Sequence, residues 1–168
     1  MTTPTVRRFQ FRLSALLLLM SGLGLWLGWQ VSELHQKQQA VSVIEAVGGT
    51  VTYDYQWNTD HSWNPDAVPP GPAWLRQMLG DNYQANVVEI QLFAGSRQRP
   101  LRFTDADAKH LGVLHELKWL VLQDTNLTDQ GLLHLRSLTK LERLDIEGTH
   151  VTEAGVRKLE AALPKTKI

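Results

Sequence analysis

The chain has 168 residues with 17 basic and 17 acidic side chains, and it contains no cysteine. This length allows one folded domain of ordinary size, and the absence of cysteine excludes disulfides and thiolate sites. Because three arginines precede residue 13, the rest of the chain carries 17 − 3 = 14 basic and 17 acidic residues, and this balance of −3 argues against a nucleic-acid-binding protein.

An apolar run without charges occupies residues 13–31, behind a basic N-terminus at 1–12. About 17 to 20 helical residues span a hydrocarbon core of about 30 Å. Arginines before the run and tryptophans near its end are typical of a membrane helix whose N-terminus stays in the cytoplasm. We therefore expect a single-pass protein of the cell membrane, with its folded domain outside the cytoplasm. The predicted anchor residues are Leu13, Leu16, Leu17, Leu18, Leu19, Leu23, Leu25, Trp26, Leu27 and Trp29.

The segment 32–49 is polar and rich in helix-forming residues, and Gly48 and Gly49 at its end favour a helix stop. We expect this juxtamembrane helix to continue the membrane helix without a break and to pack its last turns on the core. Its apolar residues fall close to one helical face: Leu34, Val41, Ile44 and Val47.

The segment 50–86 is rich in aromatic residues and is interpreted as an N-terminal cap. Apolar and polar residues alternate from 51 to 57, which predicts a strand. Asparagine, aspartate and proline then predict a loop over 58–72. A short helix is expected at 73–79, burying Trp74, Leu75, Met78 and Leu79.

The segment 87–168 repeats itself. Copies of the pattern L-x-x-L-x-L-x-x-T-x-L begin at Leu117 and Leu141, a step of 141 − 117 = 24 residues that is typical of leucine-rich repeats. An irregular copy begins at Val87, with an insertion over 93–100, and residues 163–168 are expected to form a C-terminal cap. The order of segments predicts an α/β fold: a short right-handed solenoid with a mostly parallel four-stranded sheet in sequential order and helices on one side.

Several columns of the repeats have a structural explanation. We expect Thr104, Thr128 and Thr152 to be helix N-caps, and Thr125 and Thr149 to bond the backbone of the turn after each strand. Asp105, Asp129 and Glu153 follow the caps, where a negative charge meets the positive end of the helix dipole. Gly131 and Gly155 are expected to permit close approach of neighbouring backbones.

The sequence predicts no catalytic, cofactor-binding or metal-binding residues, and we expect the protein not to be an enzyme. His110 and His134 share a repeat column but lack a third ligand at a tight spacing. The carboxylates of Asp105, Asp107, Asp129 and Glu153 are candidates for acid–base chemistry, but the dipole argument already explains three of these four residues. No nucleophile elbow or phosphate-binding glycine loop occurs.

The outward-pointing strand residues are the best candidates for partner binding. Repeat proteins use this face for partners, and a tryptophan beside an apolar residue with arginine one strand away has the composition of an interaction hot spot. The competing interpretation is that the 58–72 loop covers the face with Trp57 or Trp63. The predicted partner-binding residues are Glu89, Gln91, Phe93, Trp119, Val121, Gln123, Arg143, Asp145 and Glu147.

The 24-residue copies, the closing Leu163-Pro164 segment, the Tyr53-Asp54-Tyr55 motif and the segment from Trp74 to Asp81 together resemble small membrane-anchored leucine-rich repeat proteins of planctomycete bacteria. The resemblance implies a protein-interaction module without catalytic residues. We therefore expect a membrane-anchored module that binds a protein or cell-envelope component through its strand face. The alternatives are a pilin-like assembly component that packs through its long N-terminal helix, and a secreted repeat protein whose N-terminal helix is cleaved.

Overall fold

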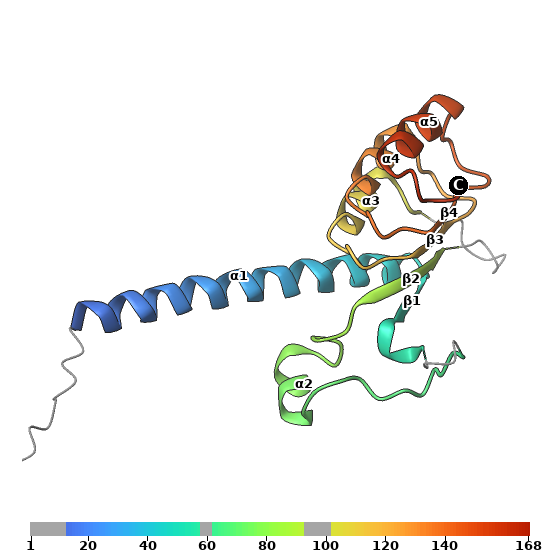
Figure 1. Cartoon of the computed structure of the whole chain (residues 1–168). Coiled ribbons are helices and arrows are strands. Elements are labelled where there is room, and N and C mark those ends of the chain that lie inside the picture. Colours follow the sequence, from blue (N-terminus) through green and yellow to red (C-terminus); the bar gives the residue numbers. More distant parts are fainter. Residues whose placement is uncertain (1–12, 58–61, 93–101) are drawn as a thin grey trace, which may run out of the picture. The chain divides into compact units, whose positions relative to one another are not determined.

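The computed structural model of the chain describes residues 13–57, 62–92 and 102–168 (Figure 1). The chain divides into two compact units, Met1–His35 and Gln36–Ile168. One helix, α1 (Leu13–Ala46), begins in the first unit and ends in the second, so the predicted continuous helix is confirmed. It stops at a turn in which Gly48 adopts a φ of +87°, a left-handed conformation that favours glycine.

The predicted transmembrane helix, and with it the single-pass location in the cell membrane, is wrong. In the part of the chain that the structure describes, no helix is long and apolar enough to cross a membrane. Serine and glycine residues interrupt the leucines of the charge-free run and lower its mean hydropathy. The predicted anchor residues with described side chains, Leu17, Leu18, Leu19, Leu23, Leu25, Trp26 and Trp29, are exposed. The side chains of Leu13, Leu16 and Leu27 lie outside the described part, as does the basic segment 1–12.

The second unit is built on a four-stranded sheet of β1 (Thr50–Tyr53), β2 (Val87–Leu92), β3 (Trp119–Leu122) and β4 (Arg143–Asp145). The predicted α/β class and sequential order of the strands are confirmed, and two of the three strand pairings are parallel, but the predicted solenoid is wrong. The sheet is mixed, because β1 runs antiparallel to β2 whereas β2, β3 and β4 are parallel. In the described part of the connection between β1 and β2, no helix crosses back over the sheet as a parallel connection would require.

The helices α3 (Asp105–Leu111), α4 (Asp129–Leu135) and α5 (Glu153–Ala162) lie side by side on one side of the sheet (Figure 1), as predicted. The leucine columns of the repeats are buried between these helices and the strands. Fully or almost fully buried side chains include Leu117, Leu120, Leu122, Leu127, Leu141, Leu144 and Phe103. From α1, Ala40 and Ile44 join the same core. The residues that alternate with this core in the strands point to the opposite side of the sheet, which we call the strand face.

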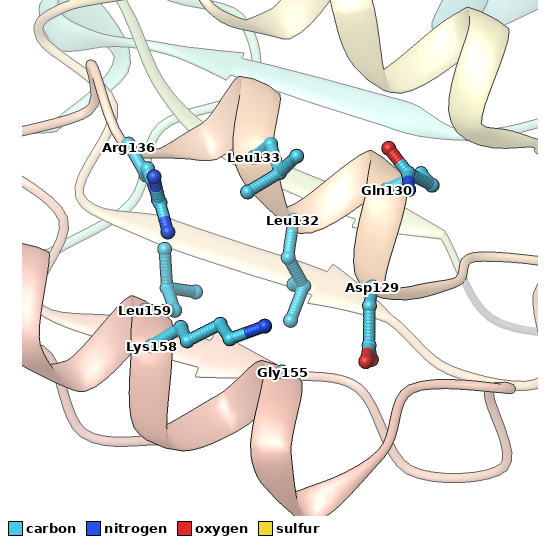
Figure 2. Close-up of a pocket in the computed structure, with 8 residues that line it drawn as sticks. All are labelled: Asp129, Gln130, Leu132, Leu133, Arg136, Gly155, Lys158 and Leu159. Atoms are coloured by element: carbon cyan, nitrogen blue, oxygen red, sulfur yellow. The ribbon is translucent and has the colours of Figure 1, made fainter.

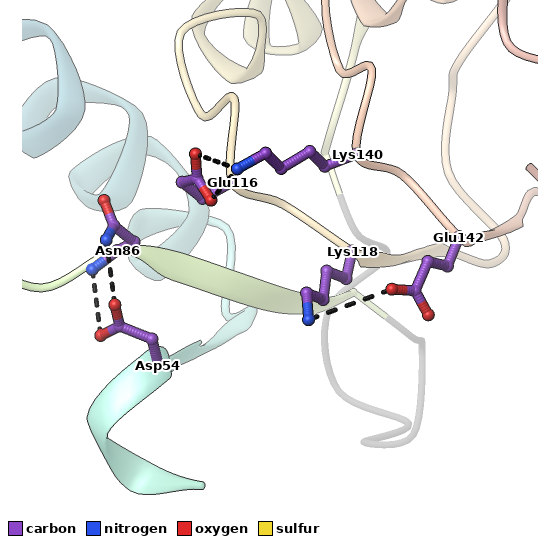
Figure 3. A network of polar contacts seen from close by, with 6 residues as sticks. All are labelled: Asp54, Asn86, Glu116, Lys118, Lys140 and Glu142. Atoms are coloured by element: carbon purple, nitrogen blue, oxygen red, sulfur yellow. Dashed lines mark hydrogen bonds and ion pairs between the residues drawn. The ribbon is translucent and has the colours of Figure 1, made fainter.

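The cap segment departs from its prediction in two places. The strand β1 ends at Tyr53, and a 3₁₀ helix, η1 (Asp54–Gln56), follows it. The carboxylate of Asp54 accepts hydrogen bonds from the side-chain amide and backbone N–H of Asn86, at 2.9 and 3.2 Å, and so ties η1 to the start of β2 (Figure 3). The short helix α2 (Ala73–Leu79) is present, but the predicted burial of Trp74 and Met78 is wrong, since 62% and 74% of their surfaces are exposed.

Two ion pairs connect neighbouring repeats, because equivalent positions of consecutive repeats lie side by side and here carry opposite charges. The ammonium group of Lys140 lies 2.7 Å from the Glu116 carboxylate, and that of Lys118 lies 4.0 Å from Glu142 (Figure 3). Each pair joins residues that are 24 positions apart. All four side chains are substantially exposed, so each pair contributes at most about 1 kcal/mol.

Candidate functional site

Two rows of side chains cross the strand face. Strand pairing sets both rows, because directly paired residues carry their side chains on the same side of a sheet. The first row is Glu89, Trp119 and Arg143, and the second is Gln91, Val121 and Asp145. Gln123 and Glu147 follow the ends of β3 and β4, and Phe93 lies outside the described residues. The structure therefore brings together the predicted partner-binding residues that it describes.

Trp119 lies at the centre of the first row and is half-buried. The ring of Trp57 contacts it edge-on, with centroids 5.4 Å apart and an interplanar angle of 82°. Trp57 in turn pairs with Trp63 in an antiparallel bridge, and 56% of the Trp63 surface is exposed. The expectation that a tryptophan of the chain itself lies on the face is met by Trp57, which covers one side of Trp119. The two rings form a joint aromatic surface.

The carboxylates on the strand face are held by neighbouring amides. The Gln91 side-chain amide donates to Glu89 at 2.6 Å, and that of Gln123 donates to Asp145 at 2.9 Å. Asp145 also accepts the backbone N–H of Glu147 at 3.2 Å. These bonds fix the positions of Glu89 and Asp145 and leave less hydrogen-bonding capacity on Asp145 for its basic neighbours.

The C-terminal segment adds a residue to the face that the sequence did not predict. The backbone of Lys167 donates to the Glu142 carbonyl at 2.9 Å and accepts from Leu144 N–H at 2.8 Å. This parallel bridge pairs Lys167 with Arg143 and extends the first row beyond β4. An open hollow of about 530 Å³ lies beside it, lined by Arg143, Leu144, Asp145, Ile146, Glu147, Lys167 and Ile168.

The acidic residues that follow the threonine caps accept hydrogen bonds from the threonine cap of the next repeat. We call these hydrogen bonds between repeats the ladder. One oxygen of Asp105 accepts the backbone N–H of Thr128 at 2.8 Å, and the other accepts its hydroxyl at 2.6 Å. Asp129 accepts the same two groups of Thr152, at 2.8 and 2.7 Å. Thr128 and Thr152 are helix N-caps, as predicted. Each carboxylate therefore fastens the cap of the next copy.

The glycine column makes room for this ladder. A Cβ atom on Gly131 would overlap the carboxylate of Asp105, and one on Gly155 would overlap that of Asp129. The expectation that these glycines serve close backbone approach is therefore wrong, because the neighbouring group is a side chain.

Asp107 takes the place of glycine in the first copy and closes the ladder at its start. No copy precedes this one to supply a carboxylate, and Asp107 provides it from within the same helix. Its Oδ2 accepts both the backbone N–H and the hydroxyl of Thr104, each at 2.8 Å. These are the same two donors that Asp105 and Asp129 satisfy in the following copies. The acidic residues at 105, 107 and 129 thus hold the fold together.

The pKa of Asp129 provides a test of the ladder. The hydrogen bonds from the Thr152 N–H and then from its hydroxyl lower the pKa of Asp129 from its ordinary value of 3.8, and Lys158 acts in the same direction. A lowered pKa in the folded state gives stability that is present above pH 3.8 and is lost as the pH falls through the folded value.

We expect Asp129→Asn to reduce the loss of stability below that pH, because the variant has no carboxylate to protonate at this position. Urea midpoints measured over a pH series test this expectation. Glu160→Gln, at an exposed acid of α5, is the control and should retain the acid sensitivity of the natural chain. An unchanged pH dependence in Asp129→Asn would contradict the role given to this carboxylate.

The hollow that the structure places on the helical side is too small for a typical ligand. A hollow of about 80 Å³ lies between α4 and α5, lined by Leu132, Leu133, Leu159 and their polar neighbours (Figure 2). It is far smaller than the roughly 300–1,000 Å³ of typical ligand pockets. Within the described part of the chain, no group of three or more histidine, aspartate or glutamate side chains is placed to hold a metal ion.

A comparison of the chain with known protein families, curated proteins and solved structures finds no match. The strand face is a part of the described surface where partly or fully exposed aromatic, apolar and charged side chains are ordered in rows.

Proposed function

We propose that the chain is a protein-interaction module that binds a protein partner through its strand face, with Trp119 at the centre of the contact. The observation that carries this proposal is the row in which Trp119 lies between Glu89 and Arg143, with Val121 next along β3. Tryptophan and arginine are the residues most enriched at binding hot spots, and charged neighbours at the rim favour a specific partner.

The two regular copies differ at the strand-face positions that a partner would contact. Their core positions repeat, since Leu120 and Leu144 occupy equivalent buried sites. Their face positions do not repeat: Trp119 corresponds to Arg143, Val121 to Asp145 and Gln123 to Glu147. Since packing requirements explain the repeated residues, the differences between the copies are available for specific recognition.

The contact with Trp57 favours binding at Trp119. A side chain that is already ordered loses less conformational entropy when a partner immobilises it, and this raises affinity. The edge-on packing of Trp57 orders the Trp119 ring while Trp119 remains only half-buried. The face thus presents a fixed aromatic group on strands of a packed domain.

Site-specific photo-crosslinking tests the proposed function. A photoreactive amino acid at position 119 of the full chain should capture a defined partner in cells, whereas the same group at position 157, exposed on α5, should not. Val121→Arg should abolish the adduct from position 119, because it places a bulky charge beside the aromatic contact. Leu133→Arg, at an exposed position of α4, is the matched control and should leave the adduct intact. Equal capture from positions 119 and 157 would contradict the proposal.

A further inference from the structure

We propose that the partner segment is acidic: its carboxylates lie over Arg143 and Lys167 while a neighbouring apolar side chain packs on Trp119. This inference rests on the proposed function and names the chemistry of its partner. We call the three residues Trp119, Arg143 and Lys167 the basic corner of the strand face.

The basic corner is defined by backbone pairing. Trp119 pairs with Arg143 across β3 and β4, and Arg143 pairs with Lys167 in the bridge that follows. Paired residues carry their side chains on one side of the sheet, about 5 Å apart. Arg143 and Lys167 are both exposed and both line the open hollow at the β4 edge. Two cations and an aromatic ring therefore form three consecutive members of one row.

Among the described residues, no carboxylate forms an ion pair with the two cations of the basic corner. Neither Arg143 nor Lys167 forms an ion pair with any residue that the structure describes, whereas Lys118 and Lys140 pair with carboxylates of the neighbouring copy. Glu142, which precedes Arg143, pairs with Lys118. Asp145, the acid next to Arg143 on the strand face, accepts hydrogen bonds from the Gln123 side chain and from the Glu147 backbone. A carboxylate of a binding partner would therefore complement the positive charges of Arg143 and Lys167, which no described residue pairs with.

The other end of the row carries the opposite charge. Glu89, on the β2 side of Trp119, is a carboxylate held by Gln91. Neighbouring strands lie about 4.8 Å apart, so the backbones at Glu89 and Arg143 are separated by about 10 Å, or roughly three residues of an extended segment. The complementary segment carries an acidic residue at one end, an apolar residue in the middle and a basic or polar residue at the other end.

The charge of the rest of the chain favours a short acidic segment over a polyanion such as a nucleic acid. Beyond residue 12 the chain has a net charge of −3, which opposes the approach of a long row of phosphates. The basic corner instead offers two adjacent charges beside an aromatic ring. This arrangement suits a protein segment in which one or two carboxylates follow an apolar side chain.

A peptide selection on the full chain tests the proposal without knowledge of the partner. The probe is a displayed library of random 12-residue peptides, from which only peptides whose binding is lost with Trp119→Ala are kept. We expect these peptides to be enriched in Asp or Glu next to an aromatic or aliphatic residue. The double variant Arg143→Glu with Lys167→Glu should weaken them tenfold or more, and added salt should weaken them as well. A double variant with the same change in charge on the helical side, Lys109→Glu with Arg157→Glu, should leave their affinity unchanged.

A charge swap separates direct contact from general electrostatics. Peptides in which the acidic residues are replaced by lysine should bind the Arg143→Glu, Lys167→Glu variant better than they bind the natural chain. Thermal unfolding of each variant shows whether the fold is retained. Trp119-dependent peptides that are neutral or basic would overturn the acidic partner and leave the proposed function standing. If no selected peptide depends on Trp119, the proposed function falls, and the inference falls with it. Binding of a single-stranded oligonucleotide that survives Trp119→Ala would show the cations to be a general anion site and would also overturn the inference.

Discussion

Gly155→Ala should lower the free energy of unfolding by about 1–3 kcal/mol in the natural chain, because the added methyl group overlaps the Asp129 carboxylate. In a chain that already carries Asp129→Ala, the same substitution should instead raise it by about 0.5–1 kcal/mol. Gly155 lies inside α5, where alanine is the better helix former, and the three atoms nearest to its added Cβ all belong to Asp129. Whether Gly155→Ala lowers or raises the free energy of unfolding therefore depends on the residue at position 129 in the preceding copy.

Urea unfolding of the natural chain, the two single variants and the double variant measures this coupling as a double-mutant cycle. Asp129→Ala alone should destabilise, since it removes the acceptor of both Thr152 donors. If the two substitutions instead prove additive, the carboxylate does not occupy the space above Gly155, and the ladder described here is not the arrangement that stabilises the stack.

The periodic part of the fold could be predicted from the sequence because burial alone determines it. Leucines at fixed positions of each copy had to face one core, and Leu117, Leu120 and Leu122 are all fully buried. The caps at Thr128 and Thr152 were also predictable, since they depend on residues within one helical turn.

The direction of β1 could not be predicted in the same way. Alternation of apolar and polar residues indicates a strand, but the same pattern fits parallel and antiparallel pairing. The connection to β2 decides between them, and it contains the exposed helix α2 in place of a helix packed over the sheet. The Trp74 and Met78 pair also shows that an apolar pattern in a short helix does not ensure burial.

The ladder between copies was missed for a related reason. A dipole argument considers Asp105 and Asp129 within their own helices, whereas their actual partners are the threonines 23 residues later. The signal that would have identified the ladder is the coincidence of two features. The two copies that are preceded by a copy with an acidic residue, Asp105 or Asp129, carry glycine at this position. The first copy has no preceding copy with such an acid, and it carries Asp107 in place of the glycine.

The rows of the strand face were predictable up to their ends. The 24-residue step aligns Trp119 with Arg143, and the irregular copy aligns Glu89 with both. Lys167 was not assigned to this surface, and Trp57 was assigned to it only as one of two candidates in the competing interpretation, because both residues reach it through long-range contacts. The segment around Lys167 has no strand pattern, and the backbone of β4 determines its position.

Ile44→Ala should lower the free energy of unfolding of the second unit by about 2–5 kcal/mol, the usual range when a fully buried isoleucine is truncated. Ile44 lies in the last turns of α1 and has no exposed surface. Its carbonyl accepts the N–H of Gly49 at 2.9 Å, and a Cβ on Gly49 would lie 2.7 Å from both Ile44 and Leu92. The helix end, the turn and β2 therefore pack around one side chain.

The matched control is Glu45→Ala, which changes the next residue of the same helix at an exposed position and should alter stability by less than about 0.5 kcal/mol. Chemical denaturation followed by tryptophan fluorescence measures both variants, since Trp57 and Trp119 report on the same unit. A large difference between the variants means that the folded domain includes the last turns of α1 and that removal of the whole helix would expose the core at Ile44. Equal, small effects would mean that these turns detach without cost, and the domain would then begin at β1.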